Sequence, residues 1–113
     1  MEIILNSLLR AGGIIYNVTI KPEWSIHDEW LTWMKEVHMQ QLIDTGCFTS
    51  YKLLRMIDVD ETDGPTYAAQ YFAESKALYN RYIEKYAAAM RDKGLEKWSN
   101  KFMTFRSVLQ VVH

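Results

Sequence analysis

The chain has little cysteine, no long apolar run and no excess of charge of either sign. Its single cysteine, Cys47, excludes an internal disulfide and a cysteine-based zinc site, and favours a reducing compartment, so we expect a cytoplasmic protein. No apolar run approaches the roughly 20 residues that span a bilayer, so we expect no membrane partner. With 13 basic and 14 acidic residues, the chain lacks the basic excess that neutralises phosphates, so we expect no nucleic-acid partner.

Motifs for phosphate, nucleotide or metal chemistry are also missing. The sequence has no GxGxxG, P-loop, GxSxG or HExxH pattern. The acidic residues between positions 58 and 63 lack the regular ligand ladder of a calcium loop. His27 and His38 are eleven residues apart on one predicted helix, about 16 Å, so they cannot share a metal ion. We therefore expect no metal and no cofactor; haem, with His38 as axial ligand, is a weak alternative.

The size and composition are those of one globular domain. The chain has 113 residues, of which 49% are hydrophobic and 24% charged. Its first residues are apolar, but Glu2 stands where a signal peptide needs basic residues, so we do not expect a signal peptide. We expect residues 1–12 to be an N-terminal extension, for which disorder and an early start codon are the simplest explanations. Residues 13–113 would form a single ferredoxin-like domain.

The order of the hydrophobic periods predicts the fold. Alternating runs at 13–20, 48–57, 65–73 and 103–112 indicate strands, and helical patterns at 25–45 and 75–93 indicate helices. Ser25 and Ser75 are the expected N-caps, and Gly46 and Gly94 the expected ends, of the two helices. This βαββαβ order is typical of an α+β, ferredoxin-like fold, in which two helices cover one face of a four-stranded antiparallel sheet.

The other face of such a sheet is left uncovered. Both sides of the last strand are largely apolar, which predicts a second cover. The simplest cover is another copy of the sheet, so we expect a homodimer formed through the open face. We expect helix-on-sheet burial to involve a set of large side chains: Tyr16, Trp30, Trp33, Phe72, Phe105 and Leu109.

Four polar residues are candidates for a site. His38 lies at the edge of the apolar stripe of the first helix, where an imidazole could act as a general acid or base. A histidine at the edge of the core, satisfied by a neighbour, fits the same pattern. If a pocket lies between helices and sheet, Asn17, Tyr71 and Arg106 are the expected ligand-binding residues. RNA binding is not expected, because the third strand, PTYAAQYFA, contains no Lys or Arg.

Several segments together resemble a known bacterial family. GIIYNVTI, HDEWLTWMKEVH, GCFTSYKLLRM, TYAAQYFAES and KFMTFRSVLQVV are similar to the family called domain of unknown function 4286, over residues 14 to about 112. The resemblance implies a ferredoxin-like fold of the dimeric α/β-barrel type and no particular activity. Relatives of that wider fold include isomerases, cyclases, monooxygenases and haem enzymes, and fold analogy alone cannot choose among them.

Three functions follow from these features. The first is a cytoplasmic homodimer that binds a small, partly apolar molecule between its helices and its sheet. The second is a cofactor-free cyclase, isomerase or monooxygenase that uses His38 as its acid or base. The third is a protein–protein interaction module that acts through the dimer face or the N-terminal arm.

Overall fold

A computed structural model of the protein describes residues 11–113. The predicted extension, residues 1–12, lies almost wholly outside the described residues and stays a prediction. The described chain has the predicted order of elements, with each helix in two segments. In chain order they are β1 (Ile14–Pro22), α2 (His27–Trp33), α3 (Met39–Asp44), β2 (Ser50–Arg55), β3 (Tyr67–Ala73), α4 (Lys76–Lys85), α5 (Ala87–Trp98) and β4 (Phe102–Gln110).

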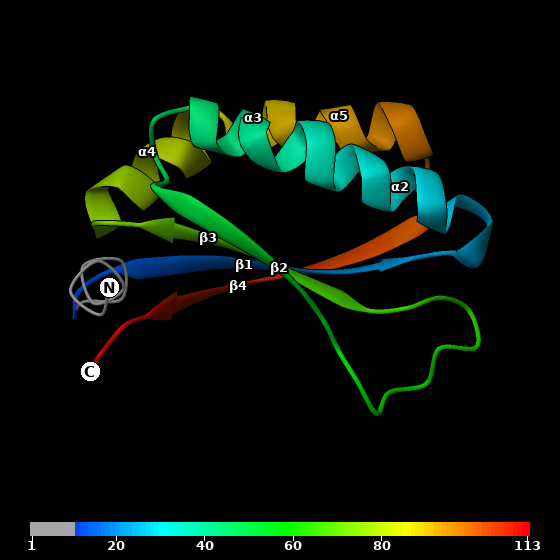
Figure 1. The fold of residues 1–113 in the computed structure, drawn as a ribbon. Helices are drawn as coiled ribbons and strands as arrows, with labels where there is room; N and C mark the ends of the chain where they lie inside the picture. The colour runs from blue at the N-terminus through cyan, green and yellow to red at the C-terminus, as the bar shows by residue number, and fades with distance from the viewer. Residues whose placement is uncertain (1–10) are drawn as a thin grey trace.

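The four strands form one sheet in the order β2-β3-β1-β4, and every neighbouring pair is antiparallel. All the helical segments lie on one face of this sheet, and the other face is bare (Figure 1). The arrangement confirms the predicted ferredoxin-like α+β fold. No helix in residues 11–113 is long and apolar enough to cross a membrane.

The core lies between the sheet and the helices. The alternation of β1 places Ile14, Tyr16, Val18 and Ile20 on the covered face, as predicted, and all four are buried. Burial of these chains against the helices, with Trp30 as the largest fully buried residue, supplies the main apolar contribution to folding.

The first helix differs from the prediction at its start and in its middle. Ser25 lies in a 3-10 turn, Trp24–Ile26, and makes no capping hydrogen bond to the helix. Its hydroxyl contacts Glu23 instead, so the predicted N-cap at Ser25 is wrong. A π-helical turn, Met34–His38, separates α2 from α3. Gly46 follows the helix with φ of +79°, the left-handed conformation expected of a residue that ends a helix.

The second helix begins as predicted and ends later than predicted. The Ser75 hydroxyl accepts a hydrogen bond from the Leu78 N–H at 3.2 Å, which confirms the cap. Tyr86, with φ of −127°, separates α4 from α5. Gly94 does not end the helix; it is buried within α5, where an added Cβ would lie 3.4 Å from the Phe102 ring. This glycine therefore allows α5 to pack closely against β4, and it does not form a turn.

The uncovered face of the sheet carries side chains that were expected in the core. Phe105 is 69% exposed and Leu109 46% exposed. The register pairs them with Thr19 and Ile15 of β1, on the face away from the helices. Phe72 pairs with Ile15 from the other side, so it also lies on this face. The expectation that these three residues lie under the helices is wrong, because each is one position out of phase with the inward set. Phe72 is nevertheless buried.

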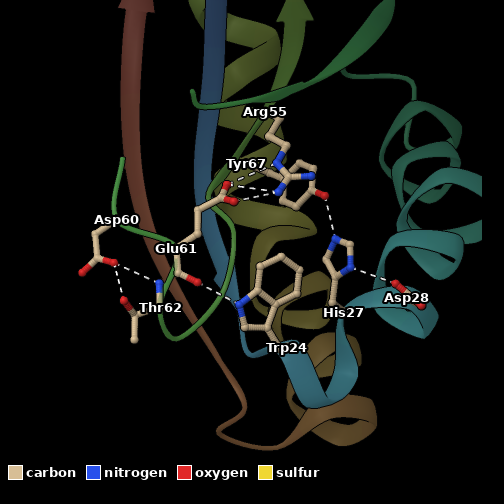
Figure 2. A network of polar contacts seen from close by, with 8 residues as sticks. All are labelled: Trp24, His27, Asp28, Arg55, Asp60, Glu61, Thr62 and Tyr67. Atoms are coloured by element: carbon tan, nitrogen blue, oxygen red, sulfur yellow. Dashed lines mark hydrogen bonds and ion pairs between the residues drawn. The ribbon is translucent and has the colours of Figure 1, made fainter. Parts of the chain in front are cut away.

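The loop between β2 and β3 is anchored to the start of the first helix (Figure 2). The Trp24 indole N–H donates to the Glu61 carbonyl at 2.8 Å. The Arg55 guanidinium holds the Glu61 carboxylate through Nε and Nη2, with a shortest distance of 2.9 Å. Asp60 accepts from both the backbone and the hydroxyl of Thr62. The carboxylates of Asp60 and Glu61 thus make contacts within the protein.

Candidate functional site

A cavity of about 280 Å³ lies between the helices and the sheet. Its wall is formed by residues from three strands, β1, β3 and β4, and from both helices. The first helix contributes both of its segments and its π-helical turn, and the second helix contributes both of its segments. Most of the wall residues are aromatic or aliphatic, and the full set is Tyr16, Val18, Ile20, Trp30, Trp33, Met34, His38, Leu42, Tyr71, Tyr82, Met90, Arg91, Gly94, Leu95, Trp98, Phe102, Thr104 and Arg106.

The structure brings three of the four sequence-predicted residues together. His38, Tyr71 and Arg106 line this one cavity, from the first helix, β3 and β4 respectively. Asn17 does not line it. Asn17 lies on the uncovered face, where its side-chain amide donates to Thr19 and Ser107 and accepts from Gln70, at 3.2–3.3 Å. Since its neighbours Tyr16 and Val18 point to the helices, the two-residue period of the strand turns Asn17 away.

The π-helical turn sets the position of His38. In a regular α-helix, residues five apart point in directions about 140° apart. Trp33 and His38 are five residues apart, and the turn between them brings their rings into a stack, 4.3 Å between centroids and 13° between planes. Such turns are frequent at functional sites. The turn therefore places the imidazole beside an indole at the cavity wall.

The surroundings of His38 favour the neutral form of its imidazole. Burial lowers the pKa of His38 below its ordinary value of 6.5, the hydrogen bond to Gln41 opposes this, and the charge of Lys93 adds to the lowering. The Nδ1 atom lies 3.1 Å from Gln41 Oε1, a contact that suits a ring with its proton on Nδ1. In the neutral ring the other nitrogen, Nε2, then holds a lone pair, and it makes no hydrogen bond with residues 11–113.

Arg106 is held at the sheet side of the cavity. Its Nε–H donates to the Tyr16 hydroxyl at 3.1 Å, and its Nη1 donates to Thr104 Oγ1 at 2.9 Å. Arg106 and Tyr16 come from neighbouring strands, on the same face of the sheet. This leaves one N–H of Nη1 and both of Nη2 without a partner among the described residues. The guanidinium is thus positioned and still able to bind.

Tyr71 is the most deeply buried of the predicted site residues. Desolvation raises the pKa of Tyr71 well above its usual range, and the nearby hydroxyl groups of Tyr82 and Tyr16 add to the rise. Burial also raises the pKa of Tyr82. Both phenols are therefore uncharged at neutral pH and can donate or accept hydrogen bonds.

Sequence reasoning missed Arg91 and Trp98, which line the cavity from α5. Trp98 packs edge-on against Trp33 at 5.9 Å, and its buried indole N–H has no acceptor in the described part of the chain. The signal was the spacing of positions 91, 94 and 98, which lie on one side of a helix. It was lost because Gly94 was expected to end that helix.

His27, the other histidine of this helix, belongs to the loop network and does not line the cavity. Its Nδ1 lies 2.9 Å from Asp28 Oδ1, and its Nε2 lies 2.7 Å from the Tyr67 hydroxyl (Figure 2). Both ring nitrogens thus have partners. Within residues 11–113, no group of three or more His, Cys, Asp or Glu side chains is placed to hold a metal ion.

The family comparison agrees with the resemblance seen in the sequence. A family model described as domain of unknown function (DUF4286) matches residues 13–112. No curated protein matches the chain significantly.

Several solved structures share the fold at low sequence identity. A variant of SnoaB, a cofactor-independent oxygenase from Streptomyces nogalater, matches with a TM-score of 0.62 and 11% identity, covering 88% of this chain and 93% of that one. A dimeric ferredoxin-like protein from an uncultured marine organism matches with a TM-score of 0.64 and 11% identity, covering 89% and 96%. A monooxygenase from the gene ActVA-Orf6 of Streptomyces coelicolor, in complex with nanaomycin D, gives 0.57 and 12%, covering 89% and 88%. These likenesses establish the fold, which is of the dimeric α/β-barrel type.

Proposed function

This chain belongs to the DUF4286 family, a domain of unknown function, and we propose that it binds a small, partly apolar molecule between its helices and its sheet. The observation that carries the proposal is the wall of the cavity. It combines large apolar surfaces with a few polar groups that retain hydrogen-bonding capacity, chiefly His38 Nε2 and the guanidinium of Arg106. Small-molecule sites in proteins have this composition.

The physical argument is that both parts of the wall favour a ligand over water. Apolar surface removed from water contributes about 25 cal/mol per Å². The aromatic rings of Trp30, Trp33 and Trp98 offer such surface. The polar groups would fix the orientation of a ligand, since each is held by a neighbour and keeps a free donor or acceptor.

A cavity-blocking variant tests the proposal. Leu95 lines the cavity and is 54% exposed, so Leu95→Trp places an indole at its wall. Ile83 is a matched control, since it is an exposed aliphatic residue on α4 that does not line the cavity. In a fragment screen by fluorine-detected NMR, we expect hits that bind the wild type and Ile83→Trp alike and weaken at least about tenfold in Leu95→Trp. Hits that bind all three proteins equally, or no hits, would contradict the proposal.

We further propose that the protein is a homodimer formed through the uncovered face of the sheet. Four large apolar residues are exposed there: Leu54, Met103, Phe105 and Leu109. Exposed apolar patches of this kind mark interaction sites. The amide cluster around Asn17 lies on the same face and would help to fix the register of two packed sheets. One structural neighbour is described as a dimeric ferredoxin-like protein, which supports a second copy as the occupant.

Sedimentation velocity tests the dimer. The wild type should sediment as a dimer, and Phe105→Lys should shift it to a monomer, because a charge would be buried without a partner. Ile83→Lys puts the same charge on an exposed helix position and should leave the dimer intact. A wild-type monomer at all concentrations would overturn this proposal and favour the interaction-module alternative, in which the patch binds another protein.

The cytoplasm is the compartment that we propose for this function. Cys47 is a free and buried thiol, which is the usual state of cysteine in a reducing environment.

A cofactor-free enzyme with His38 as acid or base is the second candidate. The observation that favours it is that His38 lines the cavity and that its Nε2 makes no hydrogen bond with residues 11–113, since a general base must be unprotonated and within reach of its substrate. Nitrogen-detected NMR of the imidazole at neutral pH tests it. A neutral ring protonated on Nδ1 is expected, and an imidazolium or an Nε2–H tautomer would contradict the role of base.

A further inference from the structure

We infer that the molecule bound in the cavity is an anion, specifically a small apolar or aromatic carboxylate. The inference rests on the proposed function, because it assigns the chemical class of the ligand at that site. It is carried by the sign of the charges in the cavity wall and by the lack of a carboxylate partner for either arginine there among the described residues.

The charges in the wall have one sign. Among residues 11–113, the cavity is lined by two arginines, Arg91 and Arg106, and by no aspartate or glutamate. Lys93 lies close enough to lower the pKa of His38 through its charge. In a chain of net charge −1, the cavity is therefore a local region of positive potential. Both arginines are exposed to solvent, so water and salt screen part of the attraction of this region for an anion.

The two cavity arginines differ from Arg55 in having no carboxylate partner. Arg55 forms an ion pair with Glu61 at 2.9 Å. Within the described residues neither Arg91 nor Arg106 forms an ion pair, and the partners of Arg106 are two uncharged hydroxyl groups. An arginine beside an apolar cavity with its charge unneutralised is a ready partner for a ligand carboxylate, which it binds through paired N–H donors.

The apolar wall favours a carboxylate over a phosphate. Arg106 has committed its Nε and one N–H of Nη1, and of the three N–H donors that remain, one on each terminal nitrogen can pair with the two oxygens of a carboxylate. A phosphate brings three oxygens and up to two charges, and the apolar wall would have to desolvate them. The aromatic residues of the wall would instead contact the apolar body of a carboxylic acid.

Isothermal titration with cinnamate and its near-isosteric neutral amide, cinnamamide, tests the inference. The two probes differ in charge and share the same body. The wild type should bind cinnamate at least about tenfold more tightly than cinnamamide. Arg106→Gln should reduce this preference to near unity, and Arg91→Gln should reduce it in part. Arg81, an exposed arginine of α4 that does not line the cavity, provides the control, and Arg81→Gln should keep the preference.

One further variant, Arg106→Lys, and the fragment screen make the outcome decisive. Arg106→Lys keeps the charge and should retain most of the preference even if Arg106→Gln folds poorly. Equal binding of both probes by the wild type would overturn the anion inference and leave the proposed function standing. A preference that survives in both Arg91→Gln and Arg106→Gln would also overturn it. Failure of both probes would overturn the inference, and it would overturn the proposed function as well only if the fragment screen also yields no hit that Leu95→Trp blocks.

Discussion

The start and the middle of the first helix carry histidines that look alike in the sequence and differ in the structure. His27, near the start, stacks on Tyr67 at 5.8 Å and has both ring nitrogens within 3 Å of a partner. His38, near the cavity, stacks on Trp33 at 4.3 Å and uses one nitrogen only. Aromatic stacking is therefore common to both, and hydrogen-bond saturation separates them.

The difference teaches how to tell a histidine that holds a fold together from one that is free to act. A buried polar group with every partner in place contributes to stability, and losing it leaves its partners unsatisfied. A half-satisfied imidazole in a cavity wall contributes less to stability and can bind or transfer a proton. The comparison supports a structural role for the region of His27 and agrees with the binding role that we propose for the region of His38.

Trp30 belongs to both regions, so its replacement should affect stability and binding together. It packs against Tyr67 of the His27 region at 5.2 Å and also lines the cavity. Trp30→Ala should lower the free energy of unfolding by about 3–5 kcal/mol, because it removes a fully buried indole. Urea denaturation measures this loss, and cinnamate binding should weaken with it. A loss below about 1 kcal/mol would show that the two regions are not joined through this indole.

His27→Ala should affect stability alone. It leaves the Tyr67 hydroxyl without its partner beneath the loop network, so we expect a loss of about 1–3 kcal/mol by urea denaturation. Cinnamate affinity, measured on the folded protein, should stay within about twofold of the wild type. A large drop in affinity with unchanged stability would reverse the assignment of the two histidines.

His38→Ala should give the opposite result. One hydrogen bond and one ring stack are lost at a partly exposed position, so the loss of stability should be about 1 kcal/mol. The affinity for cinnamate should change by at least about fivefold, because the imidazole is part of the cavity wall. An unchanged affinity would remove His38 from the proposed site.

The smallest expected effect is on the pH dependence of the free energy of unfolding, which should also distinguish the two histidines. Burial lowers the pKa of His38 from 6.5, and Lys93 contributes while Gln41 opposes. Below pH 6.5 the unfolded chain therefore takes up a proton at this residue that the folded chain resists. This contribution to stability is complete above pH 6.5 and is lost as pH falls from 6.5 through the lowered value.

The control for this effect is His38→Gln, which cannot titrate. Denaturation midpoints followed from pH 7.5 down to about pH 5 should fall less steeply for His38→Gln than for the wild type. Parallel curves for the two proteins would contradict the lowered pKa of His38.

The sequence was sufficient for the fold because the signal for each strand and helix is local. The alternation of Ile14, Tyr16, Val18 and Ile20 identifies both β1 and its inward face. The failures have a tertiary origin. Gly94 resembles a helix end in the sequence, and its real role depends on Phe102, which lies beyond the helix in β4 and is adjacent to Gly94 in space. The outward placement of Phe105 likewise depends on register with β1.

The candidate site was predictable in part for the same reason. His38, Tyr71 and Arg106 were found as polar groups at the edge of apolar patterns, and three separate elements bring them to one cavity. Asn17 was grouped with them although the period of its own strand turns it away. The π-helical turn at Met34–His38 leaves no mark in the periodicity of the sequence, so the stacking of His38 on Trp33 could not be foreseen.

The most direct test of the account is a crystal structure of the protein grown with cinnamate. The account predicts electron density in the cavity between the helices and the sheet, with the apolar body against the aromatic wall and the carboxylate within hydrogen-bond distance of Arg106. An empty or closed cavity beside His38, or cinnamate bound only elsewhere on the molecule, would contradict the claim that this cavity is the functional site.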